Sequence, residues 1–253
     1  MLFNSITFAM FLPVVFILYY LVPHKYRWAF LLAASYVFYM NLHVGYGLLL
    51  FFTTVLTYTL ARRLEANPVS SRKKLCLWGG VLPFVLILLV YKTANPLIGQ
   101  LNQMITAGRL SLQPLTLTLL LPAGVSFYFF QSMGYLIDVY RGKINAERHF
   151  GYYALFVSFF PQLLAGPIGR ADSLLPQYKE KRPFVYENVT YGLKLMVWGY
   201  FKKLVIADVF ALTVNRIYSN AQSYVGLIFI VATLLFGIEI YWDFSGYSDI
   251  AIG

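Results

Sequence analysis

The stretch that decides the fold is "VGLIFIVATLLFGIEIYWDFSGYSDIAIG", residues 225–253. Residues 225–237 form an apolar run of the kind that lies inside a membrane, where a spanning helix needs about 20 mostly apolar residues. The run then becomes polar, because three carboxylates, two serines and two tyrosines occur in residues 239–253. Ionisable side chains are costly inside a membrane and usually face a cavity, a partner or the interface. The stretch therefore predicts a membrane helix followed by a polar element that lines a cavity or breaks the helix.

The composition indicates the same class of protein for the whole chain. Hydrophobic residues make up 59% of the 253 residues and charged residues only 12%, against roughly 25% charged residues in a soluble domain. The hydrophobic excess lies in long blocks, which predicts an all-α polytopic membrane protein. The net charge of +10 is concentrated between these blocks, at 24–27, 62–63 and 72–74. Such loops suit the cytoplasmic side and anionic lipid headgroups, so membrane lipids are expected partners and nucleic acid is not.

About eight blocks qualify as transmembrane or re-entrant helices, namely 5–22, 28–42, 44–61, 75–91, 115–139, 152–165, 189–212 and 224–242. The first block lacks a basic start and a small-residue cleavage site, so we expect a retained span and not a signal peptide. No linker separates the blocks, which predicts a single membrane domain over 1–253. The basic loops place 23–27, 62–74 and 141–148 in the cytoplasm, with the N-terminus and the 92–114 connection outside.

The first of four polar stretches is "LPAGVSFYFFQSMGYLIDVYRG", residues 121–142. Pro122 and Gly124 are expected to disturb the start of a helix. Gln131 lies in the middle of the block and is a candidate either for the lining of a cavity or for a hydrogen bond between helices. Asp138 and Arg141 are three residues apart and are expected to share a helical face, as an interfacial ion pair or as part of a site.

The second stretch, "FFPQLLAGPIGR" at 159–170, holds two prolines and two glycines and cannot form a regular spanning helix. It predicts a broken segment in which Gln162 and Arg170 face a cavity, or a helix that ends at the interface. The third, "WGYFKKLVIAD" at 198–208, places Lys202 and Lys203 in an apolar run. These lysines either reach the interface or serve a site, and Asp208 is badly spaced for pairing with them on an α-helix.

The fourth stretch is the one quoted first. Glu239 and Asp243 are four residues apart, so they repel each other unless one is protonated or both meet a cation. Ser245 and Gly246 are expected to weaken the helix, with Asp249 on a separate turn. The spacing of these acids does not predict a metal site.

No nucleophile and base are visible together in the sequence. Ser245 and Ser248 lack the Gly-x-Ser-x-Gly elbow. The histidines, His24, His43 and His149, all lie in connections between the apolar blocks.

Together the four stretches resemble the membrane-bound O-acyltransferase family, in the bacterial branch that contains alginate O-acetyltransferase and the D-alanyl transfer protein of teichoic acid synthesis. The words "PAGVSFYFFQSMGYLIDVYRG", "FFPQLLAGPIGR", "GYFKKLVIAD" and "YWDFSGYSDIAIG" occur in the order and spacing of that branch, and the opening "MLFNSITFAMFLPVVFILYYLVP" is also typical of it.

The resemblance implies a funnel of helices around a tunnel. It also implies transfer of an acyl group, which is acetyl for alginate O-acetyltransferase, from an acyl-CoA or acyl-carrier donor to hydroxyls of an extracytoplasmic polysaccharide such as alginate. No bound cofactor is implied, and extracytoplasmic acyltransferase proteins are the implied partners in a bacterial plasma membrane. The family's catalytic histidine lies after the position of Gly253, so the resemblance implies an N-terminal portion that is inactive by itself, with no catalytic role for His149. The implied tunnel-lining or supporting residues are Gln131, Asp138, Arg141, Gln162, Lys202, Lys203, Asp243, Ser245, Tyr247, Ser248 and Asp249.

Two other classes of function remain open from the sequence. An ion-coupled secondary transporter also uses broken helices and intramembrane acids, although the two halves show no matching pair of interrupted segments. A non-catalytic scaffold for an envelope assembly is the other alternative.

Overall fold

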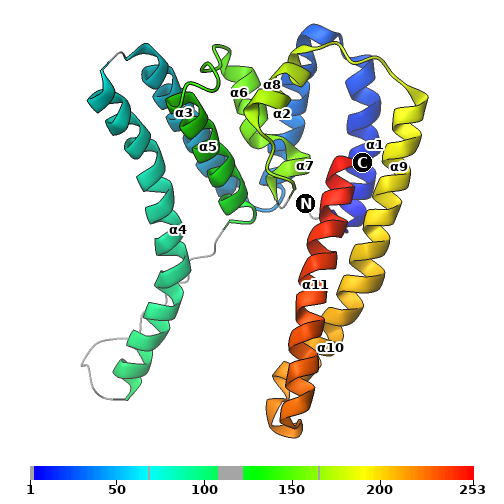
Figure 1. Ribbon diagram of the computed structural model, residues 1–253. Coiled ribbons are helices and arrows are strands. Elements are labelled where there is room, and N and C mark those ends of the chain that lie inside the picture. Colours follow the sequence, from blue (N-terminus) through cyan, green and yellow to red (C-terminus); the bar gives the residue numbers. More distant parts are fainter. Residues whose placement is uncertain (1–2, 68, 108–121, 165) are drawn as a thin grey trace. The chain divides into compact units, whose positions relative to one another are not determined.

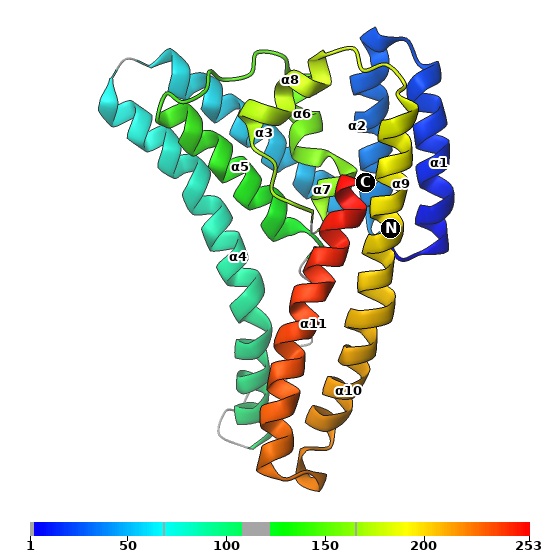
Figure 2. The same ribbon diagram turned by 45° about the vertical axis from the view of Figure 1, so that its right-hand side comes forward.

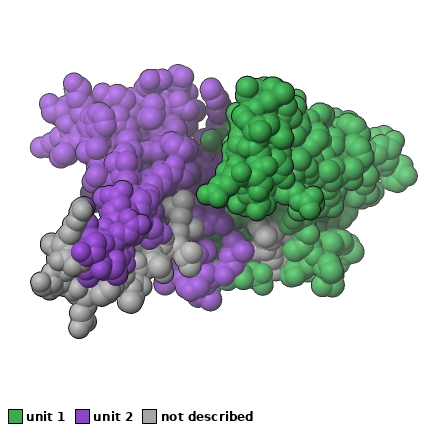
Figure 3. Space-filling model, turned by 90° about the horizontal axis from the view of Figure 1, so that it is seen from below, with its two compact units in different colours: residues 1–41, 159–168, 180–253 green, residues 42–158, 169–179 purple. Residues whose placement is uncertain are grey.

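The structure is a computed structural model that describes residues 3–67, 69–107, 122–164 and 166–253. Within these ranges every regular element is a helix, which confirms the all-α prediction. The chain forms two compact units, shown in two colours in Figure 3. Unit 1 comprises Met1–Asn41, Phe159–Ile168 and Glu180–Gly253, and unit 2 comprises Leu42–Ser158 and Gly169–Lys179. The single membrane domain stays a prediction.

The helices of each unit are labelled in Figure 1. Unit 1 contains α1 (Ile6–Leu21), α2 (His24–Met40), α7 (Phe160–Leu163), α9 (Tyr186–Tyr200), the π-helix η1 (Phe201–Ala207), α10 (Asp208–Ser219), the short η2 (Ala221–Ser223) and α11 (Gly226–Ile252). Unit 2 contains α3 (Val44–Ala66), α4 (Ser70–Thr106), α5 (Val125–Tyr140), α6 (Phe150–Ser158) and α8 (Ala171–Lys179).

Three of the described helices, α3, α4 and α11, are long and apolar enough to cross a membrane, and α1 is a shorter apolar helix. These helices confirm an all-α membrane protein. The expectation of a connection over 92–114 is wrong in part, because α4 continues to Thr106. Residues 92–106 include two leucines, two glutamines and a methionine, which favour a helix, and the helix continues through Pro96 and Gly99. Part of the 115–139 block lies outside the described residues.

The broken segment expected over 159–170 is confirmed at its start. Helix α6 ends at Ser158 and α7 begins at Phe160, so Phe159 interrupts the helix. The backbone N–H of Phe160 donates to Ser35 Oγ of α2 at 3.2 Å, within unit 1. A polar side chain of another helix thereby satisfies a donor that the break leaves without an intrahelical acceptor.

The start of α5 also agrees with the sequence, since the helix begins at Val125 after Gly124, whose φ is 77°. Its end is a Schellman cap. Gly142 has a φ of 71°, and the N–H of Lys143 donates to the carbonyl of Asp138 at 3.0 Å. Glycine suits this position because it adopts positive φ without steric cost.

Helices α9, η1 and α10 follow one another without interruption and pack along α11 (Figures 1 and 2). The expected weakening of the helix at Ser245 and Gly246 is wrong, because α11 runs unbroken to Ile252. Gly246 instead allows a close helix contact. A Cβ atom at Gly246 would lie 2.8 Å from the carbonyl oxygen of Gly199 in α9. Asp249 therefore lies on the same helix as Asp243.

Candidate functional site

Lys202 binds two polar side chains of α11. Its Nζ lies 2.5 Å from Asp249 Oδ2 and donates to Ser245 Oγ at 3.1 Å. The Lys202 and Asp249 side chains are only 12% and 19% exposed, so this is a largely buried ion pair. The ammonium also lies 5.7 Å from the ring centroids of Trp198 and Trp242, where both rings favour a cation. Lys202 is thus enclosed by unit 1 and does not extend away from it.

Lys203 bridges two carboxylates. Its Nζ lies 2.6 Å from Asp243 Oδ1 and 2.9 Å from Asp208 Oδ1. The expectation that Asp208 is badly spaced for pairing is wrong, because it assumed an α-helix. Residues 201–207 form a π-helix, whose hydrogen bonds join residues five apart and so bring Lys203 next to Asp208. Lys203 also supplies the cation that Asp243 needs beside Glu239.

Other candidate residues of unit 1 have mixed surroundings. The ring of Tyr247 stacks on Phe3, with centroids 4.5 Å apart. Ser248 Oγ and Gln162 Oε1 are buried and have no hydrogen-bond partner among the described residues. A buried polar atom without a partner is costly, so these two atoms mark places where a further polar group fits.

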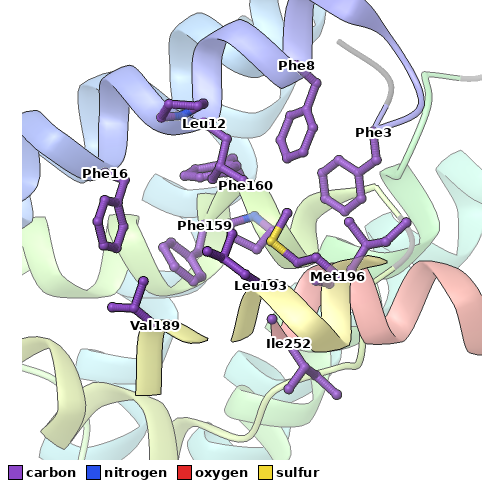
Figure 4. A pocket seen from close by; sticks show the side chains of 15 residues that line it. Phe3, Phe8, Leu12, Phe16, Phe159, Phe160, Val189, Leu193, Met196 and Ile252 are labelled. Atoms are coloured by element: carbon purple, nitrogen blue, oxygen red, sulfur yellow. The ribbon is translucent and has the colours of Figure 1, made fainter. Parts of the chain in front are cut away.

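An apolar cavity of about 450 Å³ lies in unit 1, and one of its lining residues, Ile250, directly follows Asp249, the partner of Lys202. Side chains of α1 and α9 converge on it, with Phe159 and Phe160 between them (Figure 4). The end of α11 closes it with residues 250–253. The sequence analysis missed this cavity. In the sequence, the α9 wall of the cavity appears as an apolar stripe at Val189, Leu193 and Met196. A helix surface that faces lipid has the same pattern, so the stripe does not indicate a cavity.

The candidates of unit 2 have structural partners. Gln131 is buried, and its Nε2 donates to the Phe156 carbonyl of α6 at 2.9 Å, which matches the hydrogen bond between helices. The expected pairing of Asp138 with Arg141 is wrong, because Asp138 Oδ1 lies 3.8 Å from Lys143 Nζ. The cap of α5 explains this difference, since Arg141 ends the helix and the chain turns back at Gly142. Arg170 is exposed and precedes α8.

Glu147 is a buried acid that the sequence analysis did not single out. Its Oε2 lies 2.6 Å from Lys179 Nζ, and its Oε1 accepts the N–H of His149 at 2.9 Å. The Glu147 N–H donates to the Tyr135 hydroxyl at 2.8 Å. Burial raises the pKa of the Glu147 carboxyl. Lys179 and the N–H groups of His149 and Arg148 lower it by more, so the net pKa is below its usual value. Glu147 therefore holds the 141–149 loop to α8.

Two of the histidines have local roles in the fold. His43 caps α3, with its Nδ1 accepting the N–H of Gly45 at 3.1 Å, and His149 Nδ1 accepts the N–H of Tyr152 at 3.3 Å. No group of three or more His, Cys, Asp or Glu side chains within the described ranges is arranged to hold a metal ion.

The helices and the ion pairs define the chain as an all-α membrane protein with paired lysines and acids and an apolar cavity in unit 1. Comparison with known proteins narrows this class. The whole chain aligns at 39% identity with a protein of Pseudomonas aeruginosa described as a "probable alginate O-acetylase", of which it covers 48%. It also aligns over its whole length, at 32% identity, with a peptidoglycan O-acetyltransferase of Helicobacter pylori, of which it covers 53%.

A third relative is a teichoic acid D-alanyltransferase of Streptococcus thermophilus, which is 28% identical over 136 residues, 51% of this chain and 32% of that protein. No protein-family model matches the chain. The chain spans about half the length of the first two relatives. The resemblance to the alginate O-acetylase branch is confirmed, because relatives of that name align with the whole chain.

Proposed function

We propose that this chain is the membrane-embedded portion of an O-acyltransferase that moves an acyl group, most simply acetyl, to hydroxyls of an extracytoplasmic polysaccharide such as alginate. The observation that carries the proposal is the alignment over the whole chain, at 39% identity, with the alginate O-acetylase of P. aeruginosa. The peptidoglycan O-acetyltransferase and teichoic acid D-alanyltransferase among the relatives support transfer to a cell-surface polymer in general.

The reaction is an exchange of one acyl bond for another. A hydroxyl oxygen of the acceptor forms a bond to the acyl carbonyl carbon, and the bond from that carbon to the donor breaks. The hydroxyl proton passes to a general base, and the leaving group of the donor takes up a proton. We propose an acyl-CoA or acyl-carrier derivative as the donor, and as the base a histidine other than the three in these 253 residues.

The unit 1 site supports such chemistry in two ways. The apolar cavity of about 450 Å³ lies within the range of about 300–1,000 Å³ that ligand pockets have. It suits an apolar portion of the donor or of a lipid that accompanies it. The ion pairs of Lys202 and Lys203 keep charges neutralised beside the cavity, so we propose that they hold α9, η1 and α11 in a fixed arrangement around the reacting groups.

The location and partners follow from the same proposal. We place the protein in the bacterial plasma membrane with its N-terminus outside, because the helix ends at the turns after α1 and α3 are basic. The acyl group then crosses from a cytoplasmic donor to extracytoplasmic acyltransferase partners and the glycan.

The test measures ester-linked acetyl groups on the extracellular polysaccharide of the native host. Deletion of the gene should abolish these groups, and expression of the full-length protein should restore them. Asp249→Asn should lower the acetyl content several-fold at equal protein level, because the Lys202 ammonium loses its charged partner. His149→Asn retains an acceptor for the start of α6 and should leave the acetyl content unchanged.

Three outcomes would overturn parts of the proposal. Loss of acetylation in His149→Asn at normal protein level would refute the assignment of the base. The deletion strain could instead keep its polysaccharide unchanged and show altered acetyl groups on peptidoglycan or altered D-alanine on teichoic acid. The altered polymer would then be the acceptor in place of the polysaccharide. Substrate uptake by proteoliposomes of the full-length protein, without acyl transfer, would favour the ion-coupled transporter.

A further inference from the structure

One face of α1 carries exposed apolar side chains along its whole length. Ile6, Met10, Val14, Ile17 and Leu21 are each more than half exposed and follow one another at intervals of three or four residues. Side chains at this spacing share one helical face. In a membrane protein such a face contacts lipid chains, so the end of the stripe at Leu21 places the following turn near the lipid headgroups.

Arg27 joins this turn to a distant segment of the chain. Its guanidinium carbon lies 4.7 Å from the ring centroid of Tyr19, and its Nε donates to the Val22 carbonyl at 3.2 Å. Its Nη1 donates to the carbonyl of Arg182 at 3.1 Å. These contacts leave further N–H groups of the guanidinium without a partner, because arginine has five donors. Arg27 thus connects residues 24–27 with residues 180–186, which together we call the interfacial patch.

Aromatic side chains anchor both segments of the patch. Phe184 packs on Tyr20, with ring centroids 5.4 Å apart, while Tyr26 and Tyr186 are more than half exposed. Tyrosine is enriched at membrane–water interfaces because its ring is amphipathic. The aromatic residues and the apolar stripe of α1 therefore both place the patch at the level of the lipid headgroups.

The patch carries an excess of positive charge. Lys25 and Lys181 are exposed, and neither they nor Arg27 forms an ion pair with any residue that the structure describes. Arg182 pairs with Glu180 at 2.9 Å, but both side chains are more than half exposed. The patch itself holds four cations and one acid, and Glu187 of α9 lies directly after it. With Glu187 included, the excess is still two positive charges.

We propose that the interfacial patch binds the headgroup of an anionic phospholipid, with its phosphate held by Lys25, Arg27 and Lys181. The stripe on α1 receives the acyl chains, and the aromatic residues surround the headgroup. Arginine and lysine are the residues that bind phosphate most strongly, and each basic residue near an anionic membrane surface contributes to lipid affinity.

The test measures lipid binding to the purified full-length protein by native mass spectrometry, with phosphatidylglycerol and phosphatidylcholine as probes. Lys25→Gln combined with Lys181→Gln should weaken phosphatidylglycerol binding about tenfold and leave phosphatidylcholine binding unchanged. The double variant retains Arg27, so the contact between the two segments persists and the fold is preserved.

The matched control is Lys73→Gln combined with Lys74→Gln, which removes the same charge from the start of α4, where no such aromatic and guanidinium contacts are found among the described residues. It should change phosphatidylglycerol binding less than twofold. Equal losses in both double variants would show a general charge effect and overturn the proposal. Equal binding of both lipids to the unaltered protein, or displacement of phosphatidylglycerol by soluble glycerol phosphate, would also overturn it.

Discussion

Adjacent residues on an α-helix point about 100° apart, so two neighbouring lysines ordinarily cannot serve one partner helix equally. Lys202 and Lys203 nevertheless both bind carboxylates of α11. They lie in a π-helix, where each turn holds more residues and side chains five apart become neighbours. At the scale of single residues, the π-helix is the feature that turns an isolated charge motif into paired charges.

Removal of Lys202 should destabilise the protein strongly. Lys202→Met leaves Asp249 as a largely buried charge without a cation, and breaking a buried pair costs roughly 3–5 kcal/mol. The loss should appear as a lower midpoint of thermal unfolding in detergent micelles. Lys194→Met, a change of an exposed lysine in the neighbouring helix α9, is the control and should have little effect. Equal stability of the two variants would contradict a buried ion pair.

Glu147 should make the stability depend on pH in the acid range. Its pKa is lower in the folded state than in the unfolded chain, because Lys179 and backbone N–H groups favour the carboxylate. The stabilisation is therefore fully present above the unfolded pKa of about 4.3 and is lost as the pH falls through the lower folded value. Glu147→Gln should unfold at a lower temperature than the unaltered protein at pH 7, and the difference should shrink at lower pH. A difference that stays constant with pH would contradict this assignment.

At the scale of elements, the contact between α9 and α11 depends on glycine. Gly199 of α9 and Gly246 of α11 face each other. A second pair is formed by Gly192, seven residues before Gly199, and Gly253, seven residues after Gly246 at the end of α11. From the first pair to the second, the residue number falls by seven in α9 and rises by seven in α11, as expected for antiparallel helices. Small residues allow backbones to approach closely in membrane proteins, where dispersion contacts drive helix association.

Gly246→Ala should weaken this helix pair, although alanine is the better helix former. Its Cβ would lie 2.8 Å from the Gly199 carbonyl oxygen and 3.0 Å from the backbone nitrogen of Lys203, so the backbone must move. Overpacking of this kind costs about 1–3 kcal/mol. Gly237→Ala in the same helix meets no atom within 4 Å and should be neutral or stabilising. Unfolding in detergent followed by circular dichroism distinguishes the two, and similar effects would argue against close packing.

At the scale of the whole molecule, the basic turns should lie on one side of the membrane. We expect Asn4→Cys to react with an impermeant maleimide in intact cells, and Ser71→Cys to react only after permeabilisation, both in a Cys76→Ser background. The reason is that the helix ends beside the turns after α1 and α3 carry the arginines and lysines, whereas the turn between α2 and α3 carries none. The reverse labelling pattern would show that the N-terminus lies in the cytoplasm. It would then contradict the proposal that the acyl donor is cytoplasmic.

The sequence by itself determined the class of the protein, most helix positions and the break near Phe159, because hydrophobic block length, prolines and glycines act locally. It also identified the lysines, acids and serines of the unit 1 site through their cost in an apolar context. The tertiary structure decided which of them meet. The pairing of Lys203 with Asp208 needs a π-helix, and the use of Gly246 needs α9 beside it. The cavity needs α1, α7, α9 and α11, which come from distant parts of the chain. These features depend on packing between elements, which the local pattern of one chain does not encode.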